Sequence, residues 1–220
     1  MKKITKLMIL FALITMMLPL KALALKPNEP HNADAMWVEP SEIDLTTVSP
    51  GYRFNVTIWV NCSKTSTAWQ FMLIYNSTYL NATGCWYTAG TSSEFFQGLG
   101  TIPVEPRFNV TIWNATYVLF GESCLVNLRD PGYGSLAFVE FEVIEVPPEQ
   151  VTFELDISTA YPEDTYIIVV LDGGEEGKLE PMEALNATVI IPEFGTLAYI
   201  LLMLVISSIA VMLKKYNVKK

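Results

Sequence analysis

The chain has 220 residues, of which 51% are hydrophobic, and a formal net charge of −9. Residues 25–191 hold 22 Asp and Glu against six Lys and Arg, which gives 6 − 22 = −16 for that stretch. Nucleic acids and anionic lipid surfaces require cationic patches, so this balance excludes a nucleic-acid-binding function and favours a surface that is acidic for solubility.

Residues 1–24 have the three parts of a secretory signal peptide. The first six residues include three lysines, residues 7–20 are almost wholly apolar but too short to span a bilayer, and Ala22-Leu23-Ala24 places small residues at the −3 and −1 positions. We therefore expect cleavage after Ala24, with a retained N-terminal anchor as the alternative. Residues 25–35 are polar and contain proline, which indicates a short leader.

From residue 36 to residue 191 the hydrophobic pattern has a period of two, which is typical of strands with one buried and one solvated face. The continuous apolar run 166–171 predicts a central strand, and residues 184–191 predict the last strand. We expect nine or so short strands and no helix in this all-β region, arranged as an antiparallel two-sheet sandwich. Further clear alternation occurs in residues 54–61, 137–144 and 151–158.

One short sequence occurs twice in this region. Residues 53–59 read Arg-Phe-Asn-Val-Thr-Ile-Trp, and residues 107–113 repeat it. The flanking residues diverge at once, so we interpret the two segments as similar strands of one domain. Duplication of half a domain is the alternative.

The chain contains seven Asn-x-Ser/Thr acceptor sites for N-linked glycans, where its composition predicts about 1.5 by chance. Such sites are used only outside the cell or in a secretory lumen, so the region between the two chain ends is expected to be exported and glycosylated. The acceptors are Asn55, Asn61, Asn76, Asn81, Asn109, Asn114 and Asn186.

Two tryptophans are candidates for ligand binding. If Asn55 and Asn109 carry glycans they must face solvent, and a period of two then places Trp59 and Trp113 on the same outward face. Outward tryptophans stack on sugars or form protein-binding hot spots. The alternative is that they pack across strands or beneath their own glycans. Trp69 alternates with Phe71, Leu73 and Tyr75 and is expected in the core.

Cys62, Cys85 and Cys124 all lie in the region that we expect to be exported. An oxidising compartment favours one disulfide among them and leaves one thiol over, but the sequence does not identify the pair. Their spacing fits no zinc-binding pattern.

Residues for catalysis are scarce. His31 is the only histidine and lies in the leader, so a Ser-His or Cys-His constellation is not expected. Glu140 and Glu142 share one strand face, as a glycosidase pair requires, but a solvated strand face explains them equally well. We expect no enzyme activity and no cofactor.

A loop with Asp172, Glu175, Glu176, Glu180 and Glu183 offers oxygen ligands for Ca²⁺ but does not fit the EF-hand spacing, and a solvated acidic loop is the simpler interpretation.

The C-terminal end reads as a membrane anchor. Residues 195–213 contain no charge and span about 28 Å as a helix, close to the thickness of a bilayer core. The tail 214–220 contains four lysines, which favour the cytoplasmic side and place the rest of the chain outside.

The motif Pro192-Glu193-Phe194-Gly195 before this span resembles the sorting signals of archaeosortase-type transpeptidases. The resemblance implies an archaeal envelope protein whose tail is replaced by a lipid; an ordinary single-span anchor is the alternative.

Four segments of residues 36–191 follow one another in a distinctive order: Val48-Ser49-Pro50-Gly51 before a strand, residues 69–76, the aromatic loop with Phe95-Phe96-Gln97, and residues 134–143. This order is similar to that of the cohesin-like domains of archaeal surface proteins. It implies a nine-stranded jelly roll, related in fold to carbohydrate-binding modules, and a non-enzymatic binding role at the cell surface. The implied partners are a dockerin-like or other envelope protein, with a polysaccharide bound through exposed aromatic residues as the alternative.

Overall fold

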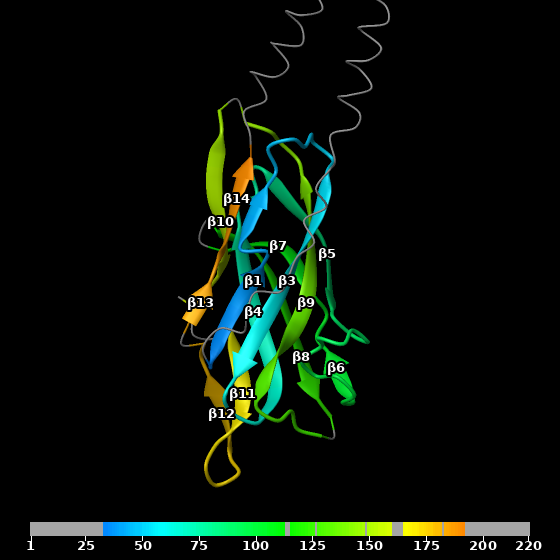
Figure 1. Ribbon diagram of the computed structural model, residues 1–220, viewed down its shortest axis with the longest axis vertical. Coiled ribbons are helices and arrows are strands. Elements are labelled where there is room, and N and C mark those ends of the chain that lie inside the picture. The colour runs from blue at the N-terminus through cyan, green and yellow to red at the C-terminus, as the bar shows by residue number, and fades with distance from the viewer. Residues whose placement is uncertain are drawn as a thin grey trace, which may run out of the picture.

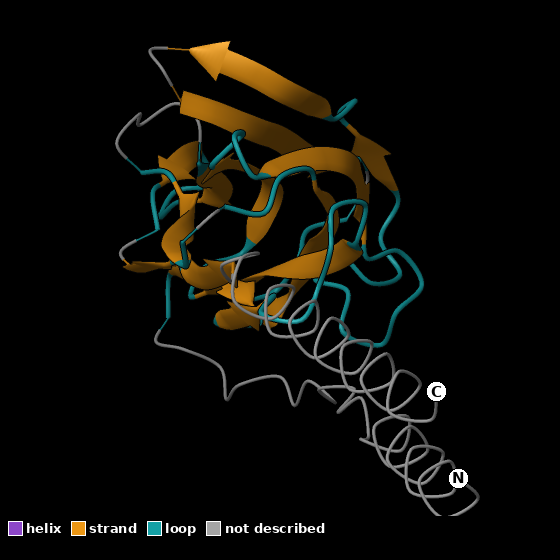
Figure 2. Ribbon diagram, turned by 90° about the horizontal axis from the view of Figure 1, so that it is seen from above, coloured by secondary structure: helices purple, strands orange, loops and turns teal. Residues whose placement is uncertain are grey.

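The structure is a computed structural model that describes residues 33–112, 115–125, 127–147, 149–159, 165–181 and 183–191. Within these residues the chain forms strands and loops (Figure 2), and no helix there has the length and apolarity that a membrane crossing requires. The expected signal peptide 1–24, most of the leader with His31, the Pro192-Glu193-Phe194-Gly195 motif, the membrane segment 195–213 and the tail 214–220 lie outside the described residues.

The strands form two sheets that pack face to face (Figure 1), which confirms the predicted all-β two-sheet sandwich. One sheet has the order β13 (Glu183–Leu185), β1 (Ala35–Glu39), β3 (Arg53–Cys62), β9 (Gly132–Val143), β5 (Leu80–Tyr87). The other follows β12 (Glu176–Leu179), β11 (Tyr166–Val170), β4 (Ser66–Tyr75), β10 (Val151–Ile157), β14 (Ala187–Ile191), β2 (Glu42–Asp44). In this second sheet β8 (Ala115–Cys124) also pairs with β4 and carries β6 (Thr101–Pro103) and β7 (Arg107–Ile112).

The described residues contain 14 strands, more than the nine or so expected, and two of the divisions lie near the ends of the described region. The first strand-forming segment, 35–44, is interrupted at Pro40, which has no N–H to continue a ladder, and β1 and β2 belong to different sheets. The predicted last strand, 184–191, is interrupted at Asn186, whose Oδ1 accepts the Ile157 N–H at 3.1 Å. As a result β13 joins the first sheet and β14 the second. Both parallel pairs, β1–β13 and β2–β14, arise from these two divisions.

The core lies between the inner faces of the two sheets and follows the predicted alternation. In β3 the residues Val56, Ile58 and Val60 are fully buried, while their neighbours are half-buried or exposed. Trp69 on β4 is 2% exposed and packs edge-on against Phe120 with 5.6 Å between ring centroids, so its predicted core position is confirmed. Burial of such large apolar side chains is the main favourable term in folding.

The apolar run 166–171 is predicted to form a central strand, and the structure confirms this, because β11 pairs with β12 on one side and with β4 on the other. The repeated sequence forms two strands in different sheets. The first copy is β3, in the middle of its sheet, and the second begins β7, an edge strand with a bulge between Arg107 and Val110.

Candidate functional site

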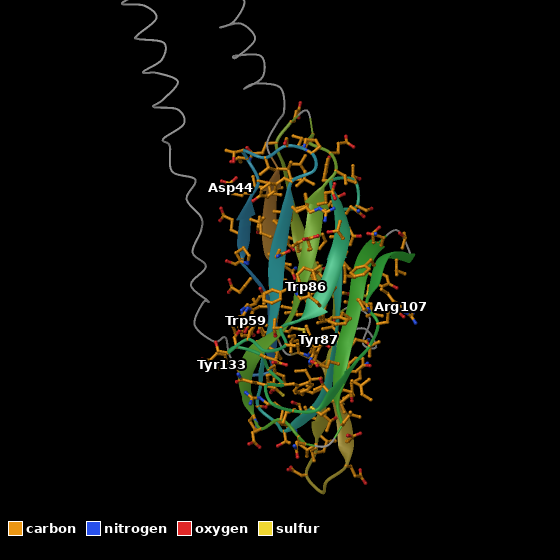
Figure 3. All side chains as sticks on the ribbon, turned by 90° about the vertical axis from the view of Figure 1, so that its right-hand side faces the viewer. Asp44, Trp59, Trp86, Tyr87, Arg107 and Tyr133 are labelled. Carbon is orange, nitrogen blue, oxygen red and sulfur yellow. The ribbon has the colours of Figure 1, made fainter. Side chains whose placement is uncertain are left out.

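The outer face of the five-stranded sheet carries four aromatic side chains, which we call the aromatic face: Trp59 on β3, Tyr133 and Phe138 on β9, and Trp86 on β5. Figure 3 labels Trp59, Tyr133 and Trp86. Trp86 is 41% exposed and Tyr133 54%. The Trp86 and Phe138 rings lie 6.2 Å apart between centroids. Exposed aromatic rings on a flat sheet bind sugar rings or apolar protein side chains, so this face is the first candidate site.

A glycine allows the Trp86 indole to lie against the sheet. A Cβ on Gly84 would stand 2.6 Å from the indole Cζ3, so only a residue without a side chain leaves room for the ring. The β5 strand has a bulge between Ala82 and Gly84, which shifts its alternation by one residue. Sequence reasoning missed Trp86 because this bulge breaks the period of two. A glycine two residues before a tryptophan in a strand is the signal that points to it.

Trp59 lies on the aromatic face, as the sequence predicts, but it is half-buried. Its ring stacks on Trp37 of the neighbouring strand β1, with centroids 6.1 Å apart and 16° between the planes. Trp59 therefore packs across strands as well as contributing surface. Trp113 and Asn114 lie outside the described residues, so the ligand role expected for Trp113 stays a prediction.

The charged end of the aromatic face is organised by Arg53. Its guanidinium contacts Glu140 at 3.2 Å and Glu142 at 3.0 Å, and the Thr83 hydroxyl donates to Glu140 at 2.5 Å. The two glutamates share one strand face as expected, but both bind the same arginine at the surface. Such exposed ion pairs orient side chains and contribute little to stability.

The glycan acceptors occupy several distinct positions in the fold. Asn55, Asn61 and Asn81 lie on the outer face of the five-stranded sheet, together with the aromatic residues. Asn76 lies in the turn after β4, where its Oδ1 accepts the Thr78 N–H at 3.0 Å. Asn186 holds β14 to β10, because its Nδ2 donates to Glu154 at 2.8 Å.

Asn109 is exposed, as a glycan acceptor must be, but its side chain is also hydrogen-bonded within the fold. It lies at the bulge of β7 with a φ of 52°, its Oδ1 accepts the Tyr75 hydroxyl, and its Nδ2 donates to the Ala82 carbonyl at 3.4 Å. The side chain thus turns towards a core tyrosine. Exposed and half-buried residues alternate with a period of two in residues 107–111, as more and less buried residues do in β3, and the bulge of β7 brings the Asn109 amide to Tyr75.

A second candidate surface lies on the outer face of the other sheet, at the end that carries the β11–β12 hairpin. Four aliphatic side chains there, which we call the aliphatic patch, are each more than half exposed: Ile102, Val104, Leu125 and Leu128. Ile102 pairs with Ser123, the Val104 N–H donates to Gly121, and the Leu125 N–H donates to Gly100, so β6 and the end of β8 hold three of them together. Contiguous exposed aliphatic groups mark interaction surfaces.

A pocket of about 320 Å³ lies beside the aliphatic patch. Leu125, Leu128 and Ile168 form its apolar wall, and Glu176 is its charged residue. The remaining lining residues are Thr67, Ala68, Ser123, Cys124 and Asn127. A mixed wall of this kind accepts an apolar side chain with a polar or cationic end. Sequence reasoning missed this site because its residues come from four separate strands and their loops.

Beneath β6 the fold buries Glu122, which is 3% exposed. The Thr101 hydroxyl donates to its Oε1 at 2.6 Å. Burial raises the pKa of Glu122, the Thr101 hydrogen bond lowers it, and the nearby Glu94 carboxylate raises it further. The carboxyl group therefore sits in an environment that disfavours its charge.

The three cysteines are free thiols, so the structure does not contain the expected disulfide. Cys62 pairs with Gly132 and Cys85 with Val139, on opposite sides of β9, which separates them by about 23 Å along that strand. A disulfide requires Cα atoms within about 7 Å. Cys124 belongs to β8 in the other sheet. Burial raises the pKa of the Cys124 thiol to about 11, which keeps it protonated at neutral pH.

The acidic residues predicted as one loop are divided between two sheets. Asp172, Glu175 and Glu176 belong to the β11–β12 hairpin and Glu180 follows β12, whereas Glu183 pairs with Ala35 in the five-stranded sheet. Among the residues that the structure describes, no group of three or more His, Cys, Asp or Glu side chains is placed to hold a metal ion. Asp172, Glu175 and Glu176 are exposed, so the hairpin forms an exposed acidic turn.

The structure is similar to several solved cohesins. A type I cohesin from Pseudobacteroides cellulosolvens is 14% identical, covers 74% of this chain and 94% of its own, and gives a TM-score of 0.46. A cohesin from Acetivibrio cellulolyticus, solved in complex with a dockerin, is 13% identical, with 71% and 99% covered and a TM-score of 0.45. A non-cellulosomal cohesin from the archaeon Archaeoglobus fulgidus is 16% identical, with 71% and 89% covered and a TM-score of 0.43.

No protein-family model and no curated protein matches the sequence. At this level of similarity no residue role passes from the solved cohesins to this chain.

Proposed function

We propose that this chain is a non-enzymatic protein-binding module of the cell surface, and that it docks a second envelope protein through the aliphatic patch and the pocket beside it. The observation that carries the proposal is the exposure of four aliphatic residues, each above 50%, two of which also line a pocket with an apolar wall. The four are Ile102, Val104, Leu125 and Leu128, and the two that line the pocket are Leu125 and Leu128. The partner is dockerin-like or another envelope protein, the class that the sequence resemblance implies.

Charge indicates the chemistry of the partner. Residues 25–191 carry a formal charge of −16, and Glu176 lines the pocket itself. An apolar anchor surrounded by basic residues is the complement of such a surface, because opposite potentials guide encounter and suppress wrong partners. The partner is therefore expected to present a Leu, Ile or aromatic anchor beside Lys or Arg.

The position of the patch supports a docking role. Ile191, the last described residue, ends β14 at one end of the sandwich, and the β11–β12 hairpin lies at the opposite end (Figure 1). With the segment 195–213 as the anchor, the patch is presented away from the bilayer. None of the six described glycan acceptors belongs to the patch or to the pocket lining.

The test compares two leucines of the patch with an exposed aliphatic residue elsewhere. A partner is isolated by affinity capture from native envelope, purified, and its Kd measured against the full chain, the double variant Leu125→Ser/Leu128→Ser, and the control Ile144→Ser, which is 46% exposed and lies outside the patch. We expect the double variant to weaken binding about tenfold or more and the control to leave it unchanged, since central apolar anchors dominate interface energies. Equal affinity of the double variant and the control overturns the proposal.

A second candidate function is polysaccharide binding on the aromatic face. The observation in its favour is that the Trp86 indole lies over Gly84 with 41% of the residue exposed and with Phe138 beside it. Binding of an envelope polysaccharide that is lost in Trp86→Ala but retained in Leu125→Ser/Leu128→Ser would replace the first proposal with this one.

A further inference from the structure

Two glycan acceptors on β3 have the same orientation but opposite surroundings. Asn55 and Asn61 lie on the same strand, on the same outer face, six residues apart. Asn55 has Arg53 two residues before it and pairs directly with Glu140 of β9. Asn61 has Trp59 two residues before it and pairs directly with Tyr133 of β9. The fold thus provides a charged setting for one acceptor and an aromatic setting for the other.

The distances place the aromatic groups within reach of the first sugar on Asn61. Side chains directly opposite in a sheet have Cβ atoms about 5 Å apart, and residues i and i+2 of one strand are about 6.6 Å apart. Tyr133 is 54% exposed and Trp59 is half-buried, so both keep surface that can be covered. A sugar ring presents C–H groups on one face, and these pack on aromatic rings and remove apolar surface from water.

The backbone around Asn61 is held in place. The Ser63 hydroxyl donates to the Asp34 carboxylate at 2.7 Å, and the Ser63 N–H donates to the same group at 2.9 Å. Asn61 itself pairs with Ala35 of β1 as well as with Tyr133 of β9, so its strand has neighbours on both sides. A glycan attached there starts from a rigid point and loses little entropy when it settles on its neighbours.

We propose that Asn61 carries an N-linked glycan whose first sugar packs on Tyr133 and Trp59, so that this glycan is part of the folded structure, whereas a glycan on Asn55 extends freely into solvent. The proposal goes beyond the docking function, because it concerns the opposite sheet and requires only that the chain is exported and glycosylated. The glycan on Asn61 would then cover part of the aromatic face of the same molecule.

The experiment uses the full chain in detergent, produced once in a host that attaches N-glycans and once in a host that does not. Asn61→Gln and Asn55→Gln are compared with the unchanged chain by intact mass and thermal unfolding. In the glycosylated protein we expect Asn61→Gln to lower the Tm by about 2–4 °C and Asn55→Gln by less than half of that. In the unglycosylated protein Asn61→Gln is expected to lower the Tm by less than it does in the glycosylated protein.

A third variant identifies the contact. Tyr133→Ala is expected to lower the Tm of the glycosylated protein more than that of the unglycosylated protein. In the glycosylated Tyr133→Ala protein, adding Asn61→Gln is expected to cause no further loss of Tm. An unoccupied Asn61 in the mass spectrum, or equal effects of Asn61→Gln and Asn55→Gln in the glycosylated protein, overturns the proposal. Loss of partner binding in Leu125→Ser/Leu128→Ser has no bearing on either result.

Discussion

Glu122 is a buried carboxyl group whose charged form is favoured by the Thr101 hydroxyl and the Trp69 side chain but disfavoured more strongly by burial. Unfolded, a glutamate has a pKa of about 4.3, and burial raises the pKa in the folded state. The folded state therefore binds this proton more tightly than the unfolded state. The contribution of Glu122 to stability is most favourable below the unfolded pKa and is lost as the pH rises through the folded pKa.

Because the raised pKa of Glu122 makes the folded state less stable as the pH rises, Glu122→Gln is expected to stabilise the protein at neutral pH. At pH 7 we expect the variant to have a higher Tm than the parent, because the amide removes a buried charge and keeps an oxygen that accepts the Thr101 hydroxyl. Near pH 4 the two proteins are expected to have similar Tm values. Thermal unfolding at both pH values tests this, with Glu140→Gln as control, since the Glu140 side chain is 24% exposed and paired with Arg53. A lower Tm for Glu122→Gln at pH 7 contradicts the argument.

At the level of single residues, the sequence predicts some positions correctly and misses others. The alternation in residues 54–61 predicted the buried and exposed sides of β3, and the pattern around Trp69 predicted a core position; the structure confirms both. Trp86 was missed because a bulge shifts the alternation of β5. The division of the last strand at Asn186 was missed because it depends on hydrogen bonds to Glu154 and Ile157 of another strand.

Among the elements, the loop between β5 and β6 differs most from its expected character. The sequence predicts an aromatic loop without indicating its burial, and Phe95 and Phe96 are 0% and 1% exposed. The loop is attached to β9 by backbone hydrogen bonds: the Phe95 N–H donates to Ser135, and the Ser135 N–H donates to Ser93. Burial of this kind comes from packing between distant parts of the chain, which no local period reports.

The attachment of this loop to β9 depends on a glycine. A Cβ on Gly134 would lie 2.7 Å from the Phe95 Cα and 2.9 Å from its N, so the loop backbone rests directly on the strand. We expect Gly134→Ala to displace the loop and destabilise the protein by about 1–3 kcal/mol, the usual cost of overpacking. Denaturant unfolding measures the change.

Gly100→Ala is the matched control, since a Cβ there meets no atom within 4 Å. It is expected to leave the free energy of unfolding within about 0.5 kcal/mol of the parent. Similar losses in both variants would show that the close contact between Gly134 and Phe95 does not limit the fold.

Over the whole molecule, like charges dominate the surface. Residues 25–191 contain 22 acidic and six basic residues, and the strongest pairing of opposite charge in the described region, at Arg53, uses two glutamates. Repulsion among unpaired carboxylates destabilises the compact state and is screened over about 8 Å at physiological salt.

Added salt is therefore expected to stabilise the protein at neutral pH. The Tm should rise between about 10 mM and 150 mM NaCl at pH 7, because the Debye length falls from about 30 Å to about 8 Å. The rise should be smaller near pH 4, where many carboxylates are protonated. A Tm that is independent of salt at pH 7, or that falls, shows that self-repulsion is not a significant term.

The two parallel strand pairs have a mechanical consequence. The β1–β2 segment and the β13–β14 segment run side by side through both sheets, paired as β1–β13 and β2–β14. Tension applied along β14 at Ile191 acts parallel to these strands, so the hydrogen bonds of both pairs share the load and must rupture together. Unzipping from one end, which breaks such bonds singly and at low force, is not available to a chain pulled in this direction.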